Sequence, residues 1–77
     1  MSKDRRLTSR EVLKLFNYLN FKLVNEKGSH KNFKSHITGR IVTLVTKDLE
    51  IEKGTYAKMQ RNAGINFLEE YNKMKGN

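Results

Sequence analysis

The sequence predicts an α+β domain: one three-stranded antiparallel sheet with its helices on one face, in the order α-β-β-β-α plus a short C-terminal helix. Two observations support this. Runs of apolar residues at helical spacing lie near both ends of the chain. Between them lie three short runs of strand-forming residues, separated by two glycine turns. Helices that flank such a sheet in the sequence are expected to cover one face and leave the other open.

The length, cysteine content and charge of the chain limit its domain number and the partners that it can bind. A chain of 77 residues forms one domain, residues 1–77, with room for one thin core. It has no cysteine, which excludes disulfides and thiolate metal sites, and it starts without a signal-peptide-like apolar run, so we expect a cytoplasmic protein. Sixteen Lys and Arg against eight Asp and Glu give a net charge of +8. This charge favours a polyanionic partner, above all nucleic acid.

A first helix is predicted over residues 9–19. Thr8 and Glu11 form a capping-box pattern just before it. Asn20 is a residue type that ends helices in the left-handed conformation. The apolar positions at helical spacing are Val12, Leu13, Leu15, Phe16 and Leu19.

Three strands are predicted next. Residues 21–26 and 29–35 form a hairpin around a turn at Lys27-Gly28. Residues 41–46 form the third strand, after a turn at residues 38–40, and have the highest β-branched content of the chain. The result is an antiparallel sheet of three neighbouring strands.

Alternation along the second strand decides which side chains reach the open face. Phe33 is the one large apolar residue of that strand, so its face is expected to point toward the core. His30 then points outward. By this alternation Ser29, Lys31, Phe33 and Ser35 share the core face, and His30, Asn32, Lys34 and His36 share the outer face.

The C-terminal part is predicted to be helical. A charged connection over residues 47–53 leads to a second helix that begins at Gly54-Thr55 and stops at Gly64. Asn66 and Glu69 repeat the capping pattern before a short third helix. Its apolar residues, which fold it back onto the core, are Phe67, Leu68, Tyr71 and Met74.

The candidate site is the segment Lys27-Gly28-Ser29-His30-Lys31. Imidazole changes charge near neutral pH, as proton transfer to and from a ribose hydroxyl requires, and lysines attract phosphates. His30 is the candidate catalytic residue, and the predicted RNA-binding residues are Lys27, Gly28, Ser29, Lys31 and Lys34. In an arbitrary basic protein the same histidine is more often exposed with no task. The His and acidic residues lack metal-ligand spacing, so we expect no metal and no cofactor.

The order of elements, with Gly28-Ser29-His30, Phe33, Gly54-Thr55 and Ala63-Gly64-Ile65, resembles the HicA family of toxins over nearly the whole chain. The resemblance implies a double-stranded-RNA-binding-domain-like fold and the toxin of a type II toxin–antitoxin system. It further implies an endoribonuclease that cleaves mRNA, an mRNA interferase, with a HicB-type antitoxin as its partner, and it places the family's catalytic histidine at His30. Many relatives have a proline and further histidines after the third strand. This chain has residues 45–48, Val-Thr-Lys-Asp, in that place, so it lacks those residues or uses Lys47 instead. The departure implies a slower enzyme or another RNA preference.

Two other interpretations stay open. The fold can dock on RNA by shape and charge without cleaving it, as double-stranded-RNA-binding domains do. The basic surface can also serve only to dock an acidic protein. A membrane partner is disfavoured because the basic residues spread from Lys3 to Lys75 instead of following one amphipathic helix.

Overall fold

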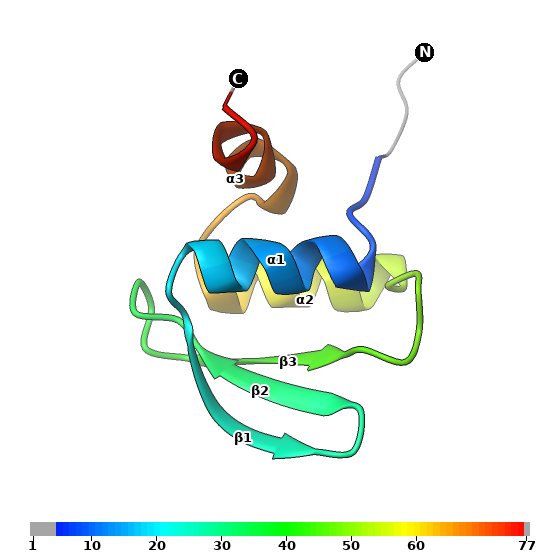
Figure 1. The fold of residues 1–77 in the computed structure, drawn as a ribbon. Coiled ribbons are helices and arrows are strands. Elements are labelled where there is room, and N and C mark those ends of the chain that lie inside the picture. Colours follow the sequence, from blue (N-terminus) through cyan, green and yellow to red (C-terminus); the bar gives the residue numbers. More distant parts are fainter. Residues whose placement is uncertain (1–4, 77) are drawn as a thin grey trace.

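The computed structural model describes residues 5–76, so the ends of the predicted domain, residues 1–4 and 77, lie outside the described part. Within it, the element order is α1 (Ser9–Tyr18), β1 (Lys22–Lys27), β2 (His30–Lys34), β3 (Ile41–Val45), α2 (Lys53–Ala63) and α3 (Phe67–Met74). The strands form one antiparallel sheet in the order β1-β2-β3. Both α1 and α2 lie on one side of the sheet, and α3 lies beyond α1 (Figure 1). The predicted α+β fold is confirmed.

The start and the end of α1 follow from its caps. Thr8 and Glu11 make both hydrogen bonds of the capping box, with Thr8 N donating to Glu11 Oε1 at 2.9 Å and Glu11 N donating to Thr8 Oγ1 at 3.2 Å. Asn20 has φ 62°, the left-handed conformation predicted for it. Phe21 N donates to Phe16 O at 3.0 Å, so Phe21 closes the helix end and β1 begins one residue later than predicted.

One aromatic cluster joins the layers. The ring of Phe16, on α1, lies 5.1 Å from the rings of Phe21 and Phe33 and 5.6 Å from that of Phe67, measured between centroids. These contacts connect α1 to β2 and α3 through fully or nearly buried side chains. Because Phe33 is fixed on the core side of β2, its neighbours along the strand must alternate around it.

The hairpin turn differs from the prediction. It consists of Gly28-Ser29, and Lys27 and His30 are the last strand residues on either side. The prediction of a Lys27-Gly28 turn, with Ser29 already in the second strand, was therefore wrong by one residue. The favoured two-residue hairpin turns have positive φ at their first position, and Gly28 supplies it with φ 59°. Ser35, predicted as the end of the second strand, lies just after β2.

Ser35 ties the loop between β2 and β3 to the end of α2. Its hydroxyl is buried, donates to Ala63 O at 2.7 Å and accepts from Ile37 N at 3.1 Å. Gly64 follows α2 with φ 80°, as predicted for a helix stop. The loop and this helix end therefore fix each other.

The starts of the last two helices are close to prediction. The second helix begins at Lys53, with Glu52 as N-cap, slightly before the predicted Gly54-Thr55 start. Asn66 caps α3 by accepting from Glu69 N at 2.9 Å. None of the helices in residues 5–76 is long and apolar enough to cross a membrane.

Candidate functional site

The sheet has an open face, away from the helices, on which side chains form three cross-strand rows. A bulge at Val24 shifts the register of β1 against β2 between Leu23 and Asn25. Because one extra residue reverses the alternation, the bulge brings Lys22 onto the open face. The first row is Lys27, His30 and Val45, the second is Asn25, Asn32 and Thr43, and the third is Lys22, Lys34 and Ile41.

His30 lines a shallow hollow in this face. Asn25, Lys27, His30, Asn32 and Thr43 line the hollow, whose volume is about 610 Å³. Its five residues are the first two rows without Val45. The His30 side chain is exposed, as alternation from Phe33 predicts. A ligand with an extended backbone can therefore reach the imidazole from solvent.

The backbone of His30 is held on both sides. It pairs with Lys27 on β1 and with Val45 on β3, in the central strand of the sheet. The preceding carbonyl, Ser29 O, accepts from Thr46 N at 2.8 Å and from Thr46 Oγ1 at 3.1 Å. The turn is thus bonded to the neighbouring strand as well as to its own hairpin. Together, the strand pairing and these hydrogen bonds fix the backbone of His30 and so the direction in which its side chain projects from the sheet.

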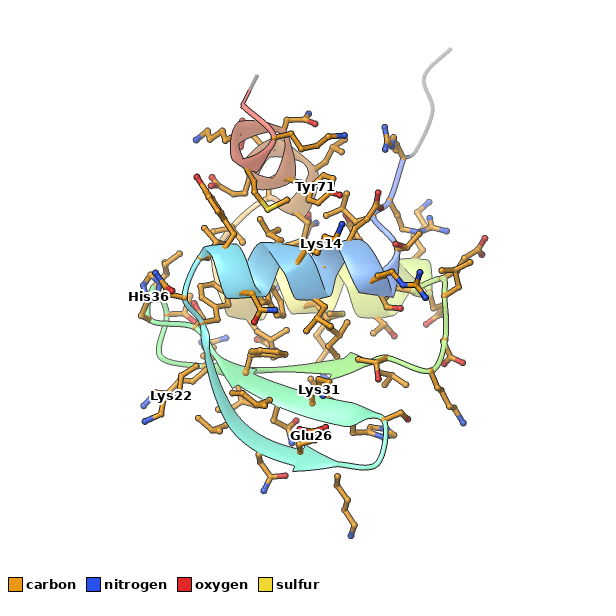
Figure 2. All side chains as sticks on the ribbon, in the orientation of Figure 1. Lys14, Lys22, Glu26, Lys31, His36 and Tyr71 are labelled. Atoms are coloured by element: carbon orange, nitrogen blue, oxygen red, sulfur yellow. The ribbon has the colours of Figure 1, made fainter. Side chains whose placement is uncertain are left out.

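The structure brings some of the predicted RNA-binding residues to His30 and separates one. Lys27 shares its row, Gly28 and Ser29 form the adjacent turn, and Lys34 lies on the same face two rows away. Lys31 instead alternates to the helix side of β2. Its Nζ lies 2.6 Å from Glu26 Oε2, in an ion pair between residues of β2 and β1 that Figure 2 labels.

Six residues of the open face lie outside the catalytic and RNA-binding set named from the sequence: Lys22, Asn25, Asn32, Ile41, Thr43 and Val45. Asn32 was placed on the outer face by alternation but given no role. The side chains of Asn32 and Thr43 are hydrogen-bonded, with Thr43 Oγ1 donating to Asn32 Oδ1 at 2.6 Å. Neither the bulge at Val24 nor the pairing of β2 with β3 has a signal in the sequence strong enough to place the others.

The open face is strongly cationic. Its three rows contain Lys22, Lys27 and Lys34 and no carboxylate. Lys22 and Lys34 are directly opposite each other, a pairing of like charges that destabilises a sheet unless an anion lies nearby. The carboxylates nearest in sequence lie outside these rows. Glu26 is on the helix side. Asp48, Glu50 and Glu52 are in the connection after β3, where they line a separate hollow with Thr43 and Val45. The arrangement suits a polyanion laid across β1 and β2.

The second histidine, His36, lies away from the candidate site. His36 lies in the loop after β2, far from the hairpin turn (Figure 2). It is exposed, as predicted, with Nε2 at 2.8 Å from Leu19 O and its ring edge-on to Phe21 at 5.2 Å between centroids. These contacts connect the loop to the end of α1. Among residues 5–76, no three His, Cys, Asp or Glu side chains gather as a potential metal site.

A comparison with protein-family models gives a match over the fold and the candidate site. The family model described as HicA toxin of bacterial toxin-antitoxin matches residues 9–65, more than half of the chain. The matched segment runs from the start of α1 to just past the end of α2, so it includes the sheet and His30 and leaves out α3. A search of curated proteins found no match.

Proposed function

The chain belongs to the HicA family of toxins from bacterial toxin–antitoxin systems, and we propose that it acts as an endoribonuclease on mRNA, with His30 as its general acid/base. The observation that carries the proposal is an exposed imidazole, held by strands on both sides, on a cationic face without carboxylates. Cleaved mRNA accounts for toxicity because it stops protein synthesis. This substrate places the activity in the bacterial cytoplasm.

The proposed reaction uses only groups of the chain and the RNA. His30 takes the proton of a ribose 2′-hydroxyl, and the oxygen attacks the adjacent phosphorus. The bond from phosphorus to the 5′-oxygen breaks, and that oxygen receives a proton from water or from protonated His30. The products are a 2′,3′-cyclic phosphate and a 5′-hydroxyl. No metal enters these steps, so metal independence is part of the proposal.

Lys27 is the cation best placed to assist. It lies directly across from His30, where it can bind the phosphate under attack and stabilise its extra negative charge. Lys34 extends the binding surface along β2, and Gly28 and Ser29 let the backbone approach the RNA. Lys31 remains a proposed contact, but it must leave Glu26 to make one.

The residues at the end of β3 and just after it affect the cleavage rate that we propose. The chain has Val45, Thr46 and Lys47 where the resemblance leads one to expect a proline and histidine. Thr46 here bonds Ser29 O and so stabilises the turn instead of contributing an acid or base. With a single imidazole on the open face, we propose slow turnover.

Membership of the HicA toxin family implies that this chain has a cognate antitoxin. We propose a HicB-type protein whose acidic surface covers the open face. Such a surface would neutralise Lys22, Lys27 and Lys34 and keep RNA from His30, and attraction between opposite charges would speed its association. The antitoxin is then displaced by high salt more readily than a partner held by apolar contacts alone.

The purified chain and a labelled transcript test the proposal. We expect new RNA ends with a cyclic phosphate and a 5′-hydroxyl, formed equally with and without EDTA. Salt-sensitive binding without new ends would instead support a non-catalytic RNA-binding module. Neither binding nor cleavage would support a protein that only docks an acidic partner. Cleavage lost in EDTA and restored by a divalent cation would contradict the metal-free chemistry.

A further inference from the structure

The second row of the open face differs from its neighbours. It consists of Asn25, Asn32 and Thr43, which are uncharged hydrogen-bonding side chains. Lysines lie in the rows on both sides, Lys27 in the first row and Lys22 with Lys34 in the third. Rows two residues apart along a strand are separated by about 6.6 Å. An RNA strand lying along β2 with phosphates on the lysine rows therefore passes directly over the amides.

Thr43 fixes the orientation of the Asn32 amide. The Thr43 hydroxyl donates to Asn32 Oδ1 at 2.6 Å, and this is the one side-chain hydrogen bond of Asn32 within residues 5–76. The bond holds Oδ1 toward β3 and leaves both Nδ2 hydrogens and one lone pair of Oδ1 for a ligand. Asn32 also lines the hollow at His30. The amide is therefore a pre-oriented donor and acceptor next to the candidate catalytic group.

A neutral amide suits a base better than a phosphate. Phosphate contacts come mostly from cations and position the strand, whereas side-chain amides pair with the donor and acceptor groups on a base edge and discriminate between bases. We propose that Asn32, oriented by Thr43, contacts the base of the nucleotide bound over the second row, next to His30, and sets the base preference of the chain. Asn32 is then a base-contacting residue and Thr43 a positioning residue. The inference rests on the proposed function in one respect, that RNA is the ligand.

The inference also fixes the substrate class. Base edges of an A-form duplex are poorly accessible in its narrow major groove, whereas unpaired bases can turn toward the protein. A sheet face reading a base through Asn32 thus takes single-stranded RNA. The double-stranded-RNA-binding-domain-like fold would here serve a different form of RNA.

Binding to uncleavable RNA tests this without needing any cleavage. The probes are four single-stranded 2′-O-methyl oligonucleotides, each of one base, measured by fluorescence anisotropy with the full chain. The wild type is expected to bind one probe more tightly than the other three. In Asn32→Ala the ratio of these affinities is expected to fall about tenfold, while the slope of log affinity against log salt stays unchanged. Thr43→Val is expected to lose part of the preference and Thr43→Ser to retain it.

Asn72→Ala is the matched control, because it removes an exposed amide from α3. It is expected to keep the wild-type preference. Equal binding of all four probes by the wild type, or an Asn32→Ala variant weakened equally for all four, would overturn the inference. A chain that discriminates between bases but cuts no RNA would retain this inference and refute the ribonuclease, so the two failures are distinguishable.

Discussion

Lys27 and His30 face each other as the last residue pair of the hairpin, on either side of the two-residue turn Gly28-Ser29. Directly opposed residues of an antiparallel pair have their Cβ atoms about 5 Å apart. Both side chains line the same hollow. A phosphate bound by the ammonium group is thereby brought to the imidazole. The geometry of the turn, more than the number of lysines, makes this end of the sheet the candidate site.

Lys27→Ala should lower RNA affinity and cleavage together. Loss of one phosphate contact is expected to weaken binding by about tenfold and to reduce the slope of log affinity against log salt by about 1. Anisotropy titrations at several salt concentrations measure both. The control is Lys14→Ala, which removes an exposed cation from α1 (Figure 2). An equal effect of both variants would mean that only total charge matters.

Lys31→Ala should affect RNA binding much less than Lys27→Ala, although the two lysines are close in sequence. Lys31 points to the helix side of the sheet and is paired with Glu26. Its side chain is 23% exposed and that of Glu26 45% exposed, so loss of the pair should change the free energy of unfolding by less than about 1 kcal/mol. Binding and urea unfolding of the two variants test this. An affinity loss as large as that of Lys27→Ala would show that Lys31 leaves Glu26 to bind RNA.

Tyr56 should make the fold less stable at high pH. Burial raises the pKa of the Tyr56 phenol above its usual value, despite a hydrogen bond accepted from Leu7 N at 3.1 Å. In the unfolded chain the Tyr56 phenol ionises near pH 10, and in the folded chain it ionises only at higher pH. The free energy of unfolding is therefore expected to fall from about pH 10 upward, as the contribution of the neutral phenol is lost.

Tyr56→Phe should flatten that fall, because no phenol remains to ionise. At neutral pH the same variant should lose about 1–3 kcal/mol, since Leu7 N is left without its partner. Tyr18→Phe, at an exposed position, should leave the neutral-pH stability unchanged. Urea unfolding at pH 7 and at pH 10–11 provides the comparison. An identical pH slope in wild type and Tyr56→Phe would show that Tyr56 is not the group responsible.

Gly64→Ala should destabilise the chain by about 2–4 kcal/mol. Gly64 has φ 80°, and an added Cβ would lie 2.6 Å from Thr38 Cγ2 and 3.0 Å from Ile37 Cγ2. Gly39→Ala is the matched control, because Gly39 has φ 79° but no atom within 4 Å of an added Cβ. Thermal unfolding should therefore show a clearly smaller loss for Gly39→Ala. Equal losses would mean that the contact with the loop after β2 contributes nothing.

Most of the fold could be predicted from the sequence because its signals are local. The Thr8 capping box, the left-handed Asn20 and the stop at Gly64 each depend on residues a few positions apart. The α+β class followed from these signals and from strand-forming runs. The outward direction of His30 followed from Phe33 alone, since alternation is strict within one strand.

The site was less predictable because it depends on pairing between strands. A turn at Lys27-Gly28 would place Asn25 opposite His30, whereas the observed turn places Lys27 there. The bulge at Val24 then reverses the alternation and brings Lys22 to the open face. A shift of one residue thus changes which side chains meet, and nothing local in the sequence determines it.

The role of His30 is tested most directly by comparing His30→Ala with His36→Ala on one labelled transcript in EDTA. Both variants remove an exposed imidazole, but only His30 lies on the open face. We expect the wild type and His36→Ala to cut the RNA, and His30→Ala to bind it with near wild-type affinity and cut nothing. Continued cleavage by pure, folded His30→Ala would contradict the assignment of the catalytic group.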